Sequence, residues 1–185
     1  MRTPEAMPPA CWSLPLRLLH WGVAALVLGL LALGFVMTNA QFDLPTSFTL
    51  YQWHKWIGLL VLALWLPRLA ARAMSGRPPE TAGWEGRVAR LVHATFYMLL
   101  LAMPLTGWLA TSASPLHLPL MVPLPFLGLV PMPELIRPDP ASYAVLSGLH
   151  EIFAFVLTAL VVLHVAGTIK HVAVDHDGTL RRMIG

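Results

Sequence analysis

Four long runs of hydrophobic residues, separated by short polar or proline-rich stretches, dominate the pattern along the chain. Each run can cross a hydrocarbon layer about 30 Å thick, because an α-helix rises about 1.5 Å per residue. The runs cover residues 14–37, 50–71, 88–110 and 146–172, the second reaching 71 only if Leu69 to Ala71 extend it. The pattern predicts an all-α integral membrane four-helix bundle, with residues 1–185 forming a single domain.

Two other interpretations of the runs are weaker. Buried core helices would need polar chain to cover them, whereas 57% of the residues are hydrophobic and only 11% are charged. An ordinary soluble domain has about 25% charged residues. The apolar region of a cleaved signal peptide spans about 7 to 15 residues, which is shorter than the first run. We therefore expect the first run to be a retained span.

The basic residues predict how the bundle is oriented, because cytoplasmic segments of membrane proteins carry an excess of Lys and Arg. On one side of the runs lie only Lys55 and Arg137, and the other side carries the rest: Arg2, Arg17, Arg68, Arg72, Arg77, Arg87, Arg90, Lys170, Arg181 and Arg182. Both termini and the 68–87 connection are therefore expected in the cytoplasm. The net charge of +3 is then explained by the basic residues of the cytoplasmic segments and does not indicate nucleic-acid binding.

The connections between the runs contain few candidate sites. Glycines and prolines in the 68–87 connection predict a turn. The proline-rich 111–141 segment is expected to be stiff and to lie at the outer membrane interface, since it also holds many apolar residues. Cys11 is the single cysteine, so it can form no internal disulfide, and we interpret it as a bystander. His117 and His176 fall in connections and are expected to be solvated.

Histidines carry the candidate chemistry, because an ionisable residue inside a bilayer is costly and usually functional. His150 and His164 are 14 residues apart in the fourth run, which is close to four helical turns and about 21 Å, so they share one face at two depths. His54, near the outer end of the second run, is the remaining intramembrane histidine at the level of His150 and pairs with it by elimination. At the inner level, His164 can pair with His20 or with His93.

Paired histidines that face each other across a bundle suit a haem iron with two axial imidazoles. A zinc site would need three or four converging ligands, and Glu151 is the sole candidate carboxylate beside an intramembrane histidine. Small residues near the histidines would let a flat macrocycle approach the backbone, although they also favour ordinary helix packing. These glycines are Gly22, Gly58, Gly148 and Gly167.

Short motifs in all four runs match one family. They are Arg17-Leu18-Leu19-His20-Trp21, His54-Lys55-Trp56-Ile57-Gly58, His93 with Met103-Pro104-Leu105-Thr106-Gly107-Trp108, Leu149-His150-Glu151, Leu163-His164-Val165-Ala166 with Lys170-His171, then Asp177-Gly178 and Arg181-Arg182-Met183. With these motifs the chain resembles the bacterial cytochrome b561 family, small four-helix di-haem proteins related to the membrane cytochromes of hydrogenases and formate dehydrogenases. The resemblance covers essentially the whole chain.

The resemblance implies two haem b groups as cofactors, their iron held axially by His20 with His164 and by His54 with His150. It also implies a respiratory oxidoreductase of the bacterial inner membrane that exchanges electrons with quinone, with superoxide as a donor proposed for such proteins on the periplasmic side. A six-coordinate iron has no open position, so we expect electron transport and not oxygen activation at the metal.

Other residues have candidate roles around these cofactors. His93 and His171 could form a quinone or proton site near the inner haem, because an imidazole titrates near neutrality. Arg17 and Arg90 each precede a histidine by one turn and could offset haem propionate charge, or simply anchor the helices. On the outer side, Lys55 with Arg137 gives a weak attraction for an anion such as superoxide.

Two other functions compete with a quinone-linked cytochrome. The chain could be a haem anchor subunit that links a soluble dehydrogenase or hydrogenase to the quinone pool, or a haem-free proton or metal transporter. An anchor is expected to present additional docking surface, whereas this chain has short tails and one modest outer loop. We therefore favour a self-contained carrier whose partners are membrane lipid, quinone and superoxide or a redox protein.

Overall fold

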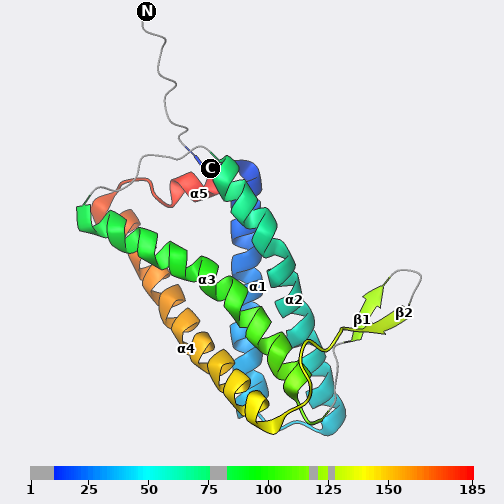
Figure 1. Cartoon of the computed structure of the whole chain (residues 1–185). Helices are drawn as coiled ribbons and strands as arrows, with labels where there is room; N and C mark the ends of the chain where they lie inside the picture. Colours follow the sequence, from blue (N-terminus) through cyan, green and yellow to red (C-terminus); the bar gives the residue numbers. More distant parts are fainter. Residues whose placement is uncertain (1–10, 76–82, 117–120, 125–127) are drawn as a thin grey trace, which may run out of the picture.

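Four long helices form most of the computed structural model, which describes residues 11–75, 83–116, 121–124 and 128–185. The helices are α1 (Leu14–Asn39), α2 (Leu44–Met74), α3 (Gly83–Ala113) and α4 (Pro140–Lys170) (Figure 1). Each is long and apolar enough to cross a membrane. The prediction of an all-α fold with four long apolar helices is therefore confirmed. Arg2, Arg77 and His117 lie outside the described residues.

Two aspartates fix where α2 and α4 begin. The Asp43 carboxylate accepts a hydrogen bond from the Thr46 amide at 3.1 Å, and Asp139 accepts one from the Ser142 amide at 2.8 Å. In both helices a proline follows within the first two positions, where its missing N–H costs nothing. The hydrogen bonds with Thr46 and Ser142 lower the pKa of both carboxyl groups from the usual value.

The second helix is longer than its hydrophobic run at both ends. It continues through Pro67 to Met74, so residues 68–74 are helical and the prediction that the connection starts at Arg68 is wrong. The residues after Pro67 are mostly leucine, alanine and arginine, which are good helix formers, and membrane helices tolerate an internal proline. His54 consequently lies about three turns inside α2, deeper than expected from the sequence.

A short antiparallel hairpin interrupts the proline-rich connection, and the sequence analysis did not predict it. Strands β1 (Met121–Leu124) and β2 (Gly128–Pro131) pair in the register Met121 to Pro131. The hairpin projects from the bundle (Figure 1), and the Trp56 indole donates a hydrogen bond to the Met121 carbonyl at 2.6 Å. The hairpin is thereby attached to α2.

The chain after α4 folds back over the start of α1. A π-helical turn (η1, His171–Asp175) follows α4, and a short helix α5 (Arg181–Ile184) comes after it. The Trp12 amide donates to the Arg182 carbonyl at 3.1 Å, and the Trp21 indole donates to the Met183 carbonyl at 3.2 Å. The described N-terminal residues and the C-terminus therefore lie at the same end of the bundle (Figure 1).

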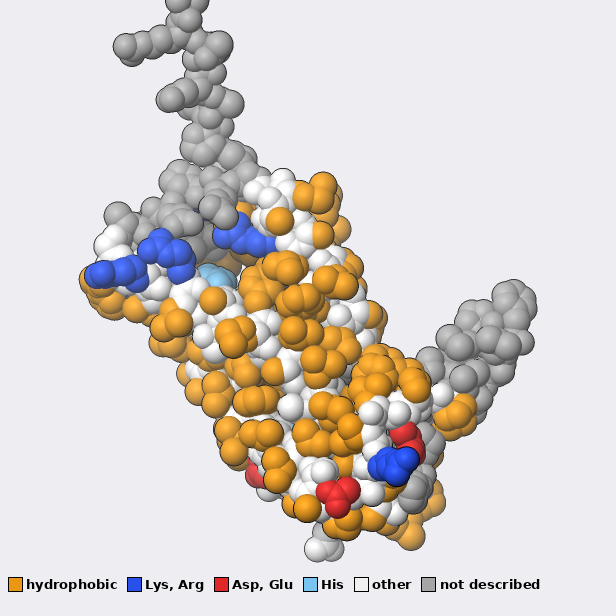
Figure 2. Space-filling view, viewed as in Figure 1, with side chains coloured by type: hydrophobic (Ala, Val, Ile, Leu, Met, Phe, Trp, Pro, Cys, Tyr) orange, Lys and Arg blue, Asp and Glu red, His pale blue; other side chains and the backbone are white. Residues whose placement is uncertain are grey.

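A small apolar core lies inside an otherwise exposed set of apolar helices. Its buried members come from all four helices: Val23, Val27, Val61, Leu99, Leu100 and Leu157. Figure 2 shows hydrophobic side chains over most of the visible helical surface, with Lys and Arg mainly toward the end that carries the C-terminus and a smaller basic patch at the other end. A soluble protein would rarely expose so much apolar area, whereas lipid would cover it favourably.

Candidate functional site

His54 of α2 and His150 of α4 face each other inside the bundle, as the sequence analysis expected. Their ring centroids are 6.1 Å apart and the ring planes meet at 71°. The helices that pack closely along the described chain are α1 with α2, α2 with α3, and α3 with α4. The pair thus joins α2 to α4 across the bundle, and not two closely packed neighbours.

Backbone and side-chain groups of α3 hold the His150 ring. Its Nδ1 lies 3.1 Å from the Met103 carbonyl oxygen and 3.3 Å from the Thr106 hydroxyl. A carbonyl can only accept, so Nδ1 carries the proton and the other ring nitrogen, Nε2, keeps its lone pair for a metal. Gly107 leaves room for the ring, since a Cβ at that position would lie 3.1 Å from His150 Cε1.

The opposite ring, that of His54, rests against α1. A Cβ added at Gly34 would lie 3.5 Å from His54 Cε1, which is ordinary van der Waals contact. The Nδ1 atom of His54 is buried and has no hydrogen-bond partner among the described residues. A buried ring nitrogen without a partner is costly, so the polypeptide alone leaves this ring incompletely satisfied.

The second group of histidines, here called the inner level, consists of His20, His93 and His164. The ring centroid of His164 lies 6.2 Å from that of His20, at an interplanar angle of 58°, and 5.5 Å from that of His93. Phe96 packs edge-on against the same ring, also at 5.5 Å. Both partners that the sequence left open are therefore adjacent to His164.

Arg68 is a site residue that the sequence analysis treated only as an indicator of orientation. One guanidinium nitrogen lies 3.0 Å from Nδ1 of His20, and the guanidinium carbon lies 5.6 Å from the Tyr97 ring centroid. This contact places the positive charge of Arg68 directly beside the inner histidines.

The arginines predicted to face haem propionates have other surroundings. The Arg17 guanidinium donates to the carbonyl of Ile184 in α5. Arg90 is exposed on α3. At the other end of the bundle, Lys55 is half-buried next to His54 and Arg137 is exposed. The roles given to these four residues remain predictions.

The glycines that contact the histidine rings differ from those named from the sequence. Nothing lies within 4 Å of a Cβ placed at the four predicted positions, which are Gly22, Gly58, Gly148 and Gly167. Gly34 and Gly107, on the helices that do not carry the outer pair, are the ones beside the rings. Sequence spacing along a helix could not reveal these contacts, because they are made between helices.

His171 belongs to an ion-pair network at the end of α4. Its Nδ1 lies 2.8 Å from a carboxylate oxygen of Asp177 and 3.0 Å from one of Asp175. Lys170 also binds Asp175, at 2.8 Å, and Glu85 of α3, at 2.9 Å, so the network joins the end of α4 to the start of α3. Although burial raises the pKa of Asp177, hydrogen bonds with Thr179 and the charge of His171 outweigh it and lower that pKa.

The remaining loop histidine behaves as expected. His176 is exposed and adopts a left-handed conformation with a φ of 51°. This turn directs the chain from η1 toward Asp177 and so helps to close the network around His171.

The two histidine levels fit axial ligation of a metal. A metal–imidazole bond is about 2 Å long, so two rings on opposite sides of one ion have centroids roughly 6 Å apart once the distance from nitrogen to ring centre is added. The separations of 6.1 Å for His54 with His150 and 6.2 Å for His20 with His164 match this value. Leu157 is buried midway between the two α4 histidines, so apolar core separates the levels.

An apolar four-helix protein that gathers histidines at two depths has the features of a small membrane cytochrome. Residues 11–185 match the family described as prokaryotic cytochrome b561, so the chain belongs to that family. It is 28% identical over 169 residues to cytochrome b561 homolog 2 of Escherichia coli (strain K12), covering 90% of this chain and 87% of that protein. With cytochrome b561 homolog 1 of the same organism, it shares 27% identity over 134 residues, or 71% and 72% of the two chains.

Membership in this family makes the chain a multi-pass electron-transfer protein of the membrane that uses haem b. The resemblance drawn from the sequence motifs is thereby confirmed.

Proposed function

We propose that the protein binds two haem b groups, one between His54 and His150 and one between His20 and His164. The observation that supports this most is the equality of the two centroid separations, 6.1 Å and 6.2 Å, at two levels of one helix. The two α4 histidines are about 21 Å apart along the helix axis. Electrons would cross most of the hydrocarbon in one step between the levels.

His20 is the better partner for His164 than His93. The 5.5 Å separation of the His93 and His164 rings is short for two imidazoles on opposite sides of one iron. His93 also directs its Nδ1 to the Ala89 carbonyl of its own helix, at 2.6 Å, and lies on the exposed surface of α3. We therefore assign His93 to the quinone side, where a substrate dissolved in the lipid would reach the inner level.

The reaction that we propose is electron transfer from a donor at the outer level to quinone at the inner level, with both termini in the cytoplasm of the bacterium. Bound haem supplies one-electron redox chemistry. With superoxide as the donor, two superoxide ions give up two electrons and become two molecules of O₂. The quinone takes those two electrons and two protons and becomes quinol. His93 and His171 would hand over the protons.

The charges at the two ends support this direction. Lys55 adjoins His54 and, with the exposed Arg137, would attract an anion toward the outer level. Carboxylates of Asp175 and Asp177 hold Nδ1 of His171 at the other end. Its second ring nitrogen would then exchange a proton with quinone, while the carboxylates hold the ring in position.

The test uses detergent-purified protein with haem quantified per chain. His150→Ala and His164→Ala are each expected to lose one haem and keep the other, while His93→Ala keeps both. A His164→Ala variant that retains two haems would contradict the assigned pairs. In proteoliposomes with quinone, superoxide is expected to reduce the quinone, and Lys55→Gln should slow this reaction at low salt more than at high salt.

A further inference from the structure

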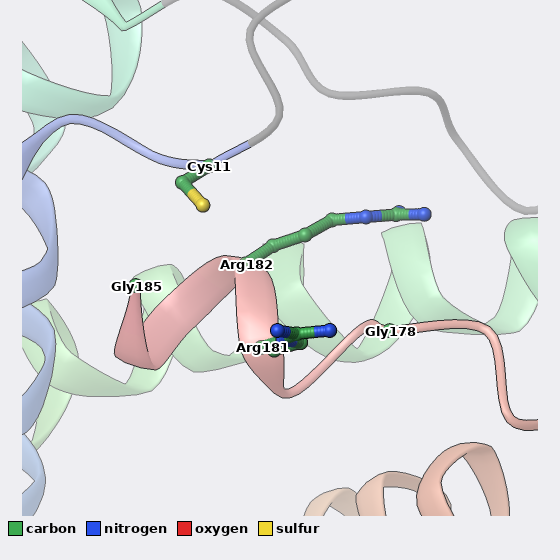
Figure 3. Close-up of a pocket in the computed structure, with 5 residues that line it drawn as sticks. All are labelled: Cys11, Gly178, Arg181, Arg182 and Gly185. Carbon is green, nitrogen blue, oxygen red and sulfur yellow. The ribbon is translucent and has the colours of Figure 1, made fainter.

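A pocket of about 400 Å³ lies at the bundle end that carries the C-terminus, and no histidine is among its described lining residues. Its lining is formed by Cys11 in front of α1 and by residues around α5: Gly178, Arg181, Arg182 and Gly185 (Figure 3). Three of these five residues have small side chains, which leaves the space open. The two others are arginines, so the chemistry of the pocket is that of an anion site.

The walls of this pocket are held in place by hydrogen bonds to the backbone carbonyls of α5. Trp12 binds the Arg182 carbonyl at 3.1 Å, Trp21 binds the Met183 carbonyl at 3.2 Å, and Arg17 donates to the Ile184 carbonyl. Because α5 is held at three successive residues, its backbone does not need to be ordered when an anion arrives. Such preorganisation lowers the entropic cost of binding.

The turn that leads into α5 requires a glycine. Gly178 has a φ of 73°, in the left-handed region that side chains disfavour. The guanidinium of Arg182, which follows this turn, donates a hydrogen bond to the carbonyl of Asp177, which precedes it, at 3.2 Å. A guanidinium has five N–H donors, so it can hold the backbone and an anion together. Figure 3 shows the Arg182 side chain extending between the segment that carries Cys11 and the turn at Gly178.

An exposed apolar stripe runs along α1 from the same place. Leu14, Leu18 and Trp21 follow one another at helical spacing on one face, and they are 59%, 65% and 48% exposed. Ile184 of α5 is exposed beside them, at 56%. The Trp21 indole donates to α5, so the stripe adjoins α5 and runs inward along α1 from Leu14 at the end of the bundle. An anion with long apolar chains would use both surfaces.

We propose that this pocket binds the phosphate of an anionic phospholipid, whose acyl chains lie along the stripe of Leu14, Leu18 and Trp21. Basic pockets at the ends of membrane helices are suited to such headgroups, and an indole at the interface suits the glycerol region. The lipid would join the start of α1 to α5. It would thereby stabilise the fold-back of the chain after α4.

Native mass spectrometry of the haem-loaded, detergent-purified protein tests this proposal. We expect phosphatidylglycerol to bind more tightly than phosphatidylcholine. Arg181→Gln and Arg182→Gln should each weaken phosphatidylglycerol binding about fivefold, and the double variant roughly thirtyfold, since each basic residue contributes about that factor near an anionic surface. Arg87→Gln is the matched control, because Arg87 is an exposed arginine that does not line the pocket, and it should change binding little.

Three outcomes would overturn the proposal. Equal binding of the two phospholipids by the unaltered protein would exclude headgroup selection. An Arg87→Gln effect as large as that of Arg182→Gln would show diffuse attraction to charge and not a site. Displacement of phosphatidylglycerol by inorganic phosphate at equal concentration would show an anion site that does not recognise lipid. Unchanged haem absorbance in each variant verifies that the bundle remains folded.

Discussion

The imidazole of His150 donates a hydrogen bond from Nδ1 to the carbonyl oxygen of Met103, 3.1 Å away on the neighbouring helix. This contact fixes which nitrogen carries the proton, so the lone pair of Nε2 is available to a metal. A hydrogen bond to the other ring nitrogen commonly orients metal-ligating histidines and tunes the metal. The outer level is therefore oriented by the backbone of α3, a helix that supplies neither histidine of the pair.

Gly107→Ala is expected to disturb the outer level selectively. The new Cβ would lie 3.1 Å from Cε1 and 3.3 Å from Nδ1 of His150, so the ring must shift by a few tenths of an ångström. Overpacking of this kind costs about 1–3 kcal/mol. Redox titration should show an altered potential or a lost haem at one level only. Gly29→Ala is the control, since nothing lies within 4 Å of its Cβ, and an equal effect there would contradict the account.

Arg68→Gln is expected to lower the midpoint potential of the inner haem. The guanidinium lies 3.0 Å from Nδ1 of His20, and loss of a nearby positive charge favours the oxidised iron by on the order of tens of millivolts. Spectroelectrochemical titration measures both potentials. Arg72→Gln, whose guanidinium stacks on Trp12 with 4.2 Å between its carbon and the ring centroid, should shift the same potential less. A higher potential in Arg68→Gln would show that the charge does not act on this level.

His20→Ala and His93→Ala separate the two neighbours of His164. We expect His20→Ala to lose one haem, because its ring is at the separation suited to axial ligation, 6.2 Å. His93→Ala should retain both haems but slow the reduction of quinone. Haem counting together with stopped-flow oxidation of the reduced protein by a soluble quinone distinguishes these effects. Loss of a haem in His93→Ala, but not in His20→Ala, would instead make His93 the haem ligand and contradict the assignment of His20.

The sequence was sufficient to predict what depends on hydrophobic runs and on spacing within one helix. It predicted the four spans, and the four-turn interval between His150 and His164 predicted two levels. The facing position of His54 followed from the same argument. These features depend on the period of an α-helix and on the thickness of a bilayer, and both are independent of the contacts between helices.

Contacts made between helices could not be predicted in the same way. The role of the Met103 carbonyl is invisible in a sequence because every residue has a carbonyl. Arg68 follows the end of the apolar run and therefore indicated only orientation, whereas α2 continues past it and places it against His20. The β1–β2 hairpin was missed because prolines disfavour strands, although a two-stranded hairpin has only edge strands, where proline is tolerated.

Asp177 gives a pH dependence with a definite sign. Its pKa is lowered from 3.8 in the folded protein, so its contribution to stability is present above that value and is lost as the pH falls through the lower, folded value. Asp177→Asn should therefore lower the melting temperature near neutral pH, and the difference should shrink as the pH falls below about 4 toward the lowered, folded pKa. Thermal melting followed by haem absorbance across this range measures it. A difference that grows toward acid pH would mean that the carboxylate is not stabilised in the fold.

The most direct test of the central proposal is the number of haem b groups per chain, measured on the detergent-purified protein by the pyridine haemochrome method and a reduced-minus-oxidised spectrum. Two histidine pairs of equal separation predict two haems per chain with sharp b-type bands. A single haem per chain in the unaltered protein would contradict the assignment of one haem to each pair. Two haems per chain in both His54→Ala and His164→Ala would contradict it as well.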